Sequence, residues 1–197
     1  MYIIINNNKN HKGFLTKKLI KLFKILKLEF KEIFTLKDLN AISNNIKGII
    51  LSGSYIDLTS KLGFNTIIHN ITAMLRYKDV PILGICFGCQ IMAMVYGGII
   101  NKFDKVCKGI KNVSVNNNNS ILFKEIKPNF KATHSHSIFI AEEPRDFEIT
   151  ARSSKNIIQA IESIKLKRFG IQFHLESDDT EYGVDILKNF IKFCENL

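Results

Sequence analysis

Residues 81–90 (PILGICFGCQ) constrain the fold more than any other part of this 197-residue sequence. They begin as an apolar run typical of a buried strand and continue into residues 88–96, whose apolar composition predicts a buried helix. Gly84 and Gly88 flank Cys86, and glycines at these positions remove the Cβ atoms that would clash in a sharp strand-to-helix turn. The segment therefore predicts a nucleophile elbow with Cys86 at its apex.

A cysteine at such a turn has the properties of a catalytic nucleophile. The thiolate is the form that attacks a carbonyl, and the N-terminus of the following helix stabilises its negative charge. In the elbow geometry the N–H of the next residue, Phe87, contributes to an oxyanion hole. Taken alone, the segment is also compatible with an ordinary buried structural cysteine.

Cys86 and Cys89 also form a C-x-x-C pair, which two other kinds of site use. A zinc site normally needs a second close pair of ligands, and Cys107 and Cys194 are isolated in the sequence, so we expect no metal site. A redox-active dithiol stays open, because a strand-to-helix turn also suits that chemistry. No disulfide framework is expected from four cysteines in a reducing compartment.

A cysteine nucleophile needs a base, and His174 is the best candidate. It follows the predicted strand at residues 168–173, and in open α/β sheets the carboxyl ends of strands, where Cys86 also lies, carry the functional site. Glu176 lies two residues further on, so in extended chain its carboxylate shares the face of the histidine and can orient the imidazole. An isolated His-x-Glu is usually a surface pair, but its combination with the elbow favours a catalytic triad. The histidines considered are His11, His69, His134, His136 and His174.

Apolar runs elsewhere predict an alternation of strands and helices. We expect strands at residues 2–5, 30–34, 46–51 and 80–85, and helices at residues 15–26, 64–76 and 181–195. The last helix is expected to turn Val184, Leu187, Phe190, Ile191 and Cys194 inward. This alternation predicts an α/β fold with an open, mostly parallel sheet and helices on both faces. With no internal repeat or linker, residues 1–197 are expected to form a single domain.

Composition and charge indicate whether the chain binds membranes or nucleic acid. The chain is 46% hydrophobic and 23% charged, as in soluble globular proteins. It lacks the run of about 20 apolar residues that spans a bilayer and the features of a signal peptide, so a cytoplasmic protein without membrane association is expected. The net charge of +10 permits nucleic-acid binding, but the most basic stretch, residues 17–31, has a helical apolar stripe. Its lysines are therefore expected on the solvent face of a packed helix, and no nucleic-acid partner is expected.

Two motifs resemble those of the class I glutamine amidotransferases. GICFGCQ resembles the Gly-x-Cys-x-Gly-x-Gln motif of that family, and GIQFHLES resembles its Gly-Val-Gln-Phe-His-Pro-Glu block. Together the motifs are specific, and the resemblance extends over most of the chain. It implies that Cys86, His174 and Glu176 form a triad that hydrolyses L-glutamine through a γ-glutamyl thioester. The ammonia released would serve an acceptor enzyme, and no cofactor is implied.

The resemblance also implies further site residues. Gly53, Gln90 and the backbone at Ser137 and Ile138 are expected to bind glutamine. The family usually has Leu-Ser-Gly-Gly-Pro where this chain has LSGSY at residues 51–55, so Ser54 supplies the second oxyanion N–H in place of a glycine. Because serine disfavours positive φ, the oxyanion hole is expected to align only when a partner docks.

The acceptor enzyme stays open at this point. The tail TEYGVDILKNFIKFC resembles the detached glutaminase subunit of archaeal-type GMP synthase, which we favour. His136-Ser137 instead resembles the glutaminase subunits of anthranilate and aminodeoxychorismate synthases. No Gly-rich nucleotide loop is present, so the ammonia-using reaction is expected on a separate synthase. The remaining alternatives are a stand-alone γ-glutamyl hydrolase and a catalytically silent binding subunit.

Overall fold

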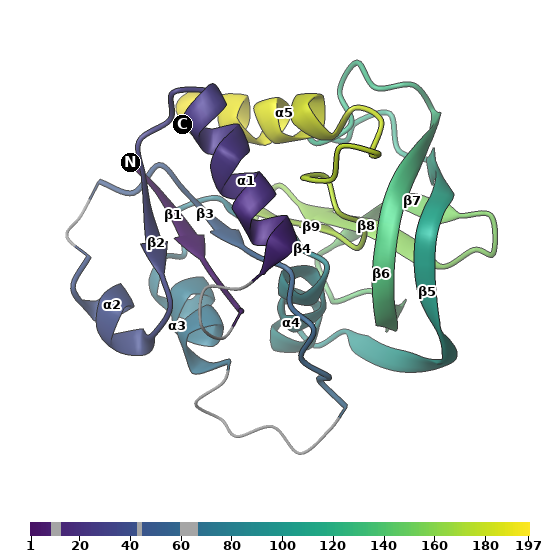
Figure 1. Ribbon diagram of the computed structural model, residues 1–197, viewed down its shortest axis with the longest axis horizontal. Coiled ribbons are helices and arrows are strands. Elements are labelled where there is room, and N and C mark those ends of the chain that lie inside the picture. The colour runs from purple at the N-terminus through teal and green to yellow at the C-terminus, as the bar shows by residue number, and fades with distance from the viewer. Residues whose placement is uncertain (9–12, 43–44, 60–66) are drawn as a thin grey trace.

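The computed structural model describes residues 1–8, 13–42, 45–59 and 67–197. These residues contain one nine-stranded sheet with the strand order β2-β1-β3-β4-β9-β8-β7-β5-β6. Neighbouring strands are parallel from β2 to β9 (Figure 1). This half of the sheet is the parallel α/β arrangement that the sequence predicts. Its strands are β1 (Tyr2–Ile5), β2 (Phe30–Ile33), β3 (Gly48–Leu51), β4 (Ile82–Ile85) and β9 (Arg168–Ile171).

The other half of the sheet is antiparallel. Strand β8 pairs with β9 and β7, and β5 pairs with β7 and β6. The long strands β5 and β6 form a ribbon at the right of Figure 1. The predicted open α/β fold is therefore confirmed, and its sheet is mixed, with one parallel and one antiparallel half. The antiparallel strands are β5 (Ile99–Val115), β6 (Asn129–Glu142), β7 (Glu148–Ser153) and β8 (Ile158–Ser163).

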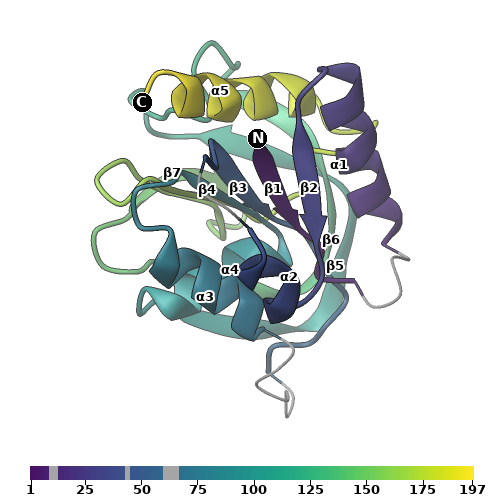
Figure 2. The ribbon, with the colours of Figure 1, turned by 90° about the vertical axis from the view of Figure 1, so that its left-hand side faces the viewer.

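Helices cover both faces of the parallel half, as Figure 2 shows. Helices α1 (Phe14–Ile25) and α5 (Gly183–Glu195) lie on one face. Helices α2 (Leu36–Asn40), α3 (Ile68–Arg76) and α4 (Phe87–Val95) lie on the other. Alternate strand residues enter two separate apolar clusters, Ile4 with Leu19 on the α1 face and Ile3 with Phe87 on the α4 face. Burial on both faces explains why β1, β3 and β4 appear in the sequence as continuous apolar runs.

Helix α1 has the arrangement expected of the basic stretch. Leu19 and Phe23 are buried, while Lys17, Lys21 and Lys24 are exposed. The apolar stripe therefore packs on the sheet and leaves the lysines in water. No helix in the part of the chain that the structure describes has the length and apolar character needed to cross a bilayer.

One of the five residues expected to face inward from helix α5 is instead exposed. Leu187, Phe190, Ile191 and Cys194 are buried as predicted, but Val184 is 38% exposed. The first turn of α5 is fixed by Gly183, where an added Cβ would lie 2.0 Å from the carbonyl oxygen of Leu175. Because Gly183 packs against the backbone of Leu175, the side chain of the next residue, Val184, points toward solvent. For the helix expected at residues 64–76, residues 64–66 lie outside the described residues, and α3 begins at Ile68.

Candidate active site

Cys86 lies at the sharp turn between β4 and α4. Its φ of 50° and ψ of −103° are unusual for a residue with a side chain. An added Cβ on Gly84 would lie 2.6 Å from the carbonyl carbon of Gly88, and one on Gly88 would lie 2.3 Å from the carbonyl oxygen of Leu51. The Cys86 N–H donates to the Ile171 carbonyl at 2.8 Å. The two glycines thus allow the close approach that an elbow needs, and the neighbouring strand holds the turn.

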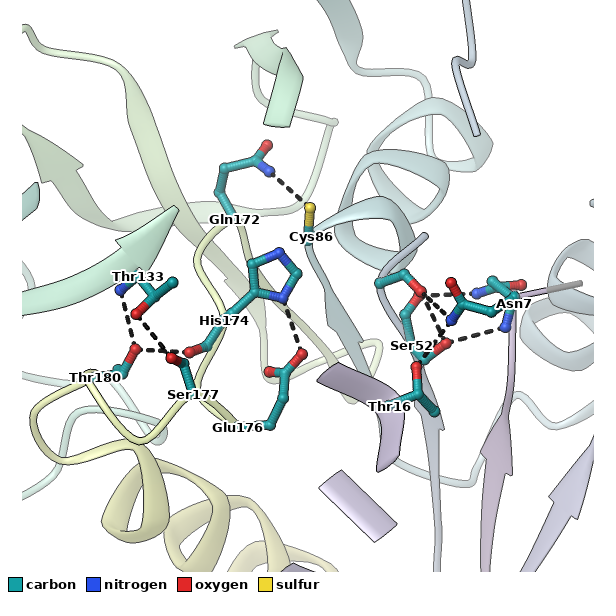
Figure 3. Close-up of polar contacts among 12 residues, drawn as sticks. Asn7, Thr16, Ser52, Cys86, Thr133, Gln172, His174, Glu176, Ser177 and Thr180 are labelled. Atoms are coloured by element: carbon teal, nitrogen blue, oxygen red, sulfur yellow. Dashed lines mark hydrogen bonds and ion pairs between the residues drawn. The ribbon is translucent and has the colours of Figure 1, made fainter. Parts of the chain in front are cut away.

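His174 and Glu176 follow β9 and lie beside this turn. The imidazole of His174 lies between Cys86 and the Glu176 carboxylate (Figure 3). His174 Nδ1 is 2.9 Å from Glu176 Oε1, and the two side chains are only 5% and 2% exposed. Burial opposes the charged imidazolium, but the negative charges of Glu176 and Cys86 outweigh it and raise the pKa of His174 well above its ordinary value. The structure therefore brings together the three side chains expected to form the triad.

The other candidate bases lie elsewhere or are neutral. Burial lowers the pKa of His134 to about 3 and that of His136 to about 4, so both imidazoles are uncharged at neutral pH. His69 is buried on α3, next to Asn70. His11 lies outside the described residues. Of the four described histidines, His174 is the one with a carboxylate partner among the observed ion pairs.

The backbone of His174 is held by residues from β6 and from the segment before α5. The His174 N–H donates to the Thr133 carbonyl at 2.9 Å, and the Thr180 hydroxyl donates to the His174 carbonyl at 2.7 Å. The Thr180 hydroxyl in turn accepts a hydrogen bond from the Thr133 N–H at 3.0 Å (Figure 3). Neither threonine was identified from the sequence, because their contact depends on which strand lies beside residue 174.

Gln172 connects Cys86 to the wall formed by β6. This fully buried amide donates to Cys86 Sγ at 3.6 Å and accepts from Gln90 Nε2 at 3.2 Å. Gln90 Nε2 also donates to the Ile138 carbonyl at 2.8 Å. The sequence prediction included Gln90 and Ile138 but missed Gln172, although it lies within the GIQFHLES segment. Gln172 and His174 are two residues apart in extended chain, so their side chains lie on the same face, and this spacing could have identified Gln172 as a site residue.

The loop expected to complete the oxyanion hole lies against Cys86 and His174. An added Cβ on Gly53 would lie 3.0 Å from His174 Cε1 and 3.7 Å from Cys86 Cβ. Neither Gly53 nor Ser54 is among the described residues with positive φ, so the serine fits this backbone without left-handed strain. Its hydroxyl donates to the Asn7 carbonyl at 2.9 Å. Phe87 begins α4, where the first N–H groups have no acceptor within the helix.

A buried polar network at the end of β1 supports this loop. Asn7 donates its N–H to the Ser52 hydroxyl at 3.0 Å and its side-chain amide to the Ser52 carbonyl at 2.9 Å. Asn70 of α3 donates to Asn7 Oδ1 at 2.7 Å, and Asn8 donates to the Gly53 carbonyl at 3.0 Å. These asparagines were not predicted as site residues, because nothing local distinguishes them from the other asparagines of the chain.

A cleft of about 210 Å³ opens beside Cys86. Gln90, Ser137 and Ile138, predicted to bind substrate, all line it, as does Ser54. Gly53 instead lines a small neighbouring recess with His174. The cleft is lined by Ser54, Tyr55, Ile56, Asp57, Cys86, Gln90, Val106, Ser135, His136, Ser137 and Ile138. The cleft therefore extends from Cys86 to residues 135–138 of β6.

Cys89 has little of the character of a redox partner. It is fully buried against Gly170, and burial raises the pKa of its thiol. Cys86 and Cys89 are both free thiols. Redox-active cysteines are accessible and readily form thiolates, so the redox interpretation of the C-x-x-C pair is not favoured.

Comparisons with known proteins agree with this site. Residues 3–193 match the family model described as glutamine amidotransferase class-I. The chain is 36% identical over 152 residues to a GMP synthase [glutamine-hydrolyzing] subunit of Methanocaldococcus jannaschii, covering 77% of this chain and 76% of that protein. It is also 36% identical over 163 residues to GMP synthase [glutamine-hydrolyzing] of Petrotoga mobilis, covering 83% of this chain. That alignment spans only 31% of the longer relative, and the chain spans less than a third of each of the first curated relatives it matches.

The fold has a counterpart among solved structures. A proposed GMP synthase subunit from Thermoplasma acidophilum superposes with a TM-score of 0.84, covering 100% of this chain and 95% of that one at 24% identity. At that identity the likeness concerns the fold, whereas the family is established by the sequence match over nearly the whole chain. The chain belongs to the class I glutamine amidotransferase family.

Proposed function

We propose that this chain is the glutaminase subunit of a GMP synthase-type enzyme, which hydrolyses L-glutamine and passes ammonia to a separate synthetase. The observation that carries the proposal is the placement of Cys86 at a strand-to-helix turn, beside the buried His174–Glu176 pair and an open cleft. The type of acceptor is supported by the detached GMP synthase subunit of Methanocaldococcus jannaschii, whose length this chain largely covers.

The first chemical step would form a thioester. The Cys86 thiolate attacks the side-chain amide carbon of glutamine, and the carbonyl oxygen becomes an oxyanion. The N–H groups of Phe87 and Ser54 are the proposed donors to this oxygen. His174 then gives its proton to the amide nitrogen, the carbon–nitrogen bond breaks, and ammonia leaves the γ-glutamyl thioester. The raised pKa of His174 suits this acid role, because the imidazole holds the proton that the leaving group needs.

The second step would release glutamate. His174, now neutral, accepts a proton from water as the oxygen attacks the thioester carbon. The carbon–sulfur bond breaks, glutamate leaves, and the thiolate and the imidazolium are restored. Glu176 keeps its hydrogen bond to Nδ1 throughout and so presents Nε2 of the imidazole to the reacting atoms.

Substrate selection is assigned to the opposite side of the cleft. Gln90 donates to the Ile138 carbonyl and so holds the β6 segment next to Cys86. We propose that the backbone at Ser137 and Ile138, with Gln90, binds the amino-acid end of glutamine. Gly53, which has no side chain to block the approach, borders the amide end.

Glutamine hydrolysis by the purified chain, alone and with a candidate GMP synthetase, tests the proposal. Cys86→Ala should abolish glutamate formation, whereas Cys89→Ala should retain most of it, because Cys89 does not reach the cleft. A glutamine-like diazo-ketone should label Cys86 in preference to Cys89 or Cys107. Equal loss of activity in both alanine variants, or labelling confined to Cys89 or Cys107, would contradict the assignment. Absence of turnover with every synthetase, with glutamine still bound, would identify a silent binding subunit.

A further inference from the structure

A second cluster of reactive side chains lies on the β5–β6 ribbon. One ligand atom from each of Cys107, His134 and His136 lies within 4.8 Å of the others. His134 and His136 alternate along β6 and so project from the same face, and Cys107 pairs directly opposite His136. Opposed residues in an antiparallel pair share a face, so the thiol and the two imidazoles converge.

A bulge in β5 creates this convergence. Lys102 pairs with Ile138 and Cys107 pairs with His136, so residues 103–106 of β5 oppose a single residue of β6. Bulges re-aim side chains next to functional sites. Without these extra residues another β5 side chain would lie opposite His136.

The two imidazoles are spaced as ligands of one metal ion. His134 Nδ1 lies 3.2 Å from His136 Nε2, and the two nitrogens share a hydrogen bond. Two nitrogens bound to tetrahedral zinc at about 2.0–2.1 Å would lie about 3.3 Å apart. His136 Nδ1 is 2.8 Å from the Ile138 carbonyl, a bond in which the ring N–H donates and which leaves Nε2 with its lone pair. Metal-bound histidines commonly have such a partner on their other nitrogen.

The side chain of His134 is 1% exposed, and its Nδ1 shares a hydrogen bond with His136 Nε2. A metal ion bound by these two nitrogens would replace that hydrogen bond, and the proton of the His134 ring would move to Nε2, which has no hydrogen-bond partner among the described residues.

The cluster borders a larger cavity that adjoins the cleft beside Cys86 and shares Val106 and His136 with it. This cavity, of about 760 Å³, is lined by all three side chains, together with Lys105, Lys108, Lys111, Lys131 and Lys155. These lysines are exposed, so water and salt screen their repulsion of a cation. Their positive charge would favour an anionic group at a coordination position that faces the cavity.

We propose that Cys107, His134 and His136 bind a zinc ion, with the fourth coordination position open to water or an anion from the cavity. One thiolate and two neutral imidazoles are a ligand set that zinc accepts. The Cys107 thiol releases its proton to solvent when the metal binds. His136 also lines the catalytic cleft. The Ile138 carbonyl accepts hydrogen bonds from both His136 and Gln90. A metal ion bound to His136 would therefore stabilise the β6 segment that lines the cleft.

Cobalt binding gives a direct test, because a thiolate bound to Co²⁺ produces a charge-transfer absorption band. The full-length chain, freed of metal and titrated with Co²⁺ or Zn²⁺, should bind one equivalent and show the band. Cys107→Ser and His134→Ala should each weaken binding by more than about 100-fold. Mutation of a residue that only hydrogen-bonds to a metal ligand already lowers metal affinity by about 10–100-fold, and loss of a ligand should cost more. Cys194→Ser, which removes a thiol distant from the cluster, should bind as the wild type does. No activity measurement is involved, so the result does not depend on the proposed glutaminase function.

The catalytic thiol is the alternative metal site, and Cys86→Ser distinguishes the two. This variant should keep both the cobalt band and the zinc affinity. Loss of the band in Cys86→Ser with its retention in Cys107→Ser would overturn the proposal, as would equal zinc affinity in the wild type and Cys107→Ser. Circular dichroism and the metal-free Tm of each variant establish that it is folded, and zinc should raise the Tm of the wild type but not that of Cys107→Ser.

Discussion

At the scale of single residues, the proposed mechanism depends on the charge state of the Cys86–His174–Glu176 group. His174 is almost completely buried, yet its pKa is raised, because two negatively charged neighbours outweigh the cost of burial. A thiolate beside an imidazolium is the arrangement expected of a cysteine nucleophile whose base already holds the proton.

Replacing Glu176 by glutamine should lower activity and shift its pH dependence. The carboxylate raises the pKa of His174, so its removal lets that pKa fall, and the imidazolium is lost at lower pH. The alkaline limb of the profile of kcat/KM against pH should therefore move to lower pH. We expect kcat to fall by about 10²-fold, the lower end of what general acid–base catalysis contributes.

Glu162→Gln is the matched control for this experiment. Glu162 is also a buried glutamate, but it accepts from Ser120 and from the Ile121 N–H, away from Cys86. Its substitution should leave the pH profile of kcat/KM unchanged. An alkaline limb that stays in place in Glu176→Gln, or that moves equally in Glu162→Gln, would show that Glu176 does not set the protonation of His174.

At the scale of secondary-structure elements, the elbow requires β3, β4 and α4 to approach without side chains between them. Gly88→Ala should destabilise the protein by about 3 kcal/mol, because the new Cβ would meet the Leu51 carbonyl oxygen at 2.3 Å. Gly109→Ala is the contrast. It has open space around it but a φ of 94°, so only backbone strain of about 1–2 kcal/mol is expected. Urea unfolding of both variants measures the difference, and equal losses would mean that the packing at Gly88 is not tight.

Arg168 joins the end of α3, the approach to β4 and the start of β9. Its guanidinium is buried and donates to the Tyr96 hydroxyl and to the carbonyls of Met74, Tyr77 and Val80. A cation near the carbonyl end of α3 is also favourable to the helix dipole. These contacts identify Arg168 as a fixed connection between three elements rather than a surface charge.

Arg168→Met should therefore destabilise the fold by about 3 kcal/mol, since it leaves several buried carbonyls without donors. Arg168→Lys should recover only part of this loss, because an ammonium cannot match the planar fork of donors. The control is Arg152→Met, which removes one exposed hydrogen bond to the Asn156 carbonyl and should change stability by less than about 0.5 kcal/mol. Comparable free energies of unfolding for Arg168→Met and Arg152→Met would contradict this account.

The elements that sequence reasoning identified best are those whose signal is local. Strands β1, β3 and β4 are buried on both faces and so form uninterrupted apolar runs, and the glycines around Cys86 mark a turn in which added Cβ atoms would clash. The strands β5 and β6 gave a weaker signal. Most residues of β5 are exposed, so it lacks the alternation of apolar and polar residues that marks a half-buried strand.

Contacts across the sheet could not be predicted from local sequence patterns. The Asn7–Ser52–Asn70 network and the contact of Gln172 with Cys86 depend on strand order and register. The cluster of Cys107 with two histidines depends in addition on the bulge in β5. Cys107 looked isolated because the sequence does not show which residue of β6 lies opposite it. Arg168 was placed in a strand without any indication that its charge would be buried.

At the scale of the whole molecule, the segment that borders both the catalytic pair and the solvent is the loop at residues 51–55. Gly53 lies against His174, whereas Tyr55 is 78% exposed at the rim of the cleft. The Ser54 hydroxyl is bonded to the Asn7 carbonyl, and Lys102 of β5 forms a 2.6 Å ion pair with Asp57. The loop is thus bonded to its neighbours at Ser54 and Asp57 and presents the aromatic side chain of Tyr55 to solvent.

Ser54 stands where the family usually has a glycine, and its φ is not positive. We propose that its N–H is misaligned with the oxyanion position until a synthetase docks, so we expect weak glutamine hydrolysis by the isolated chain and strong stimulation by the synthetase. An oxyanion donor that is misaligned until docking costs about 2.7–4 kcal/mol, or 10²–10³ in rate. Ser54→Gly combined with Tyr55→Pro, which restores the usual loop of the family, should raise partner-free kcat toward the stimulated value. Tyr55→Ala alone is the control: it removes the exposed ring but keeps Ser54, so it should weaken stimulation by the synthetase and leave partner-free turnover low. Unchanged partner-free turnover in the double variant, with the Ser54 N–H shown to point at the oxyanion position, would mean that this loop does not limit the isolated glutaminase.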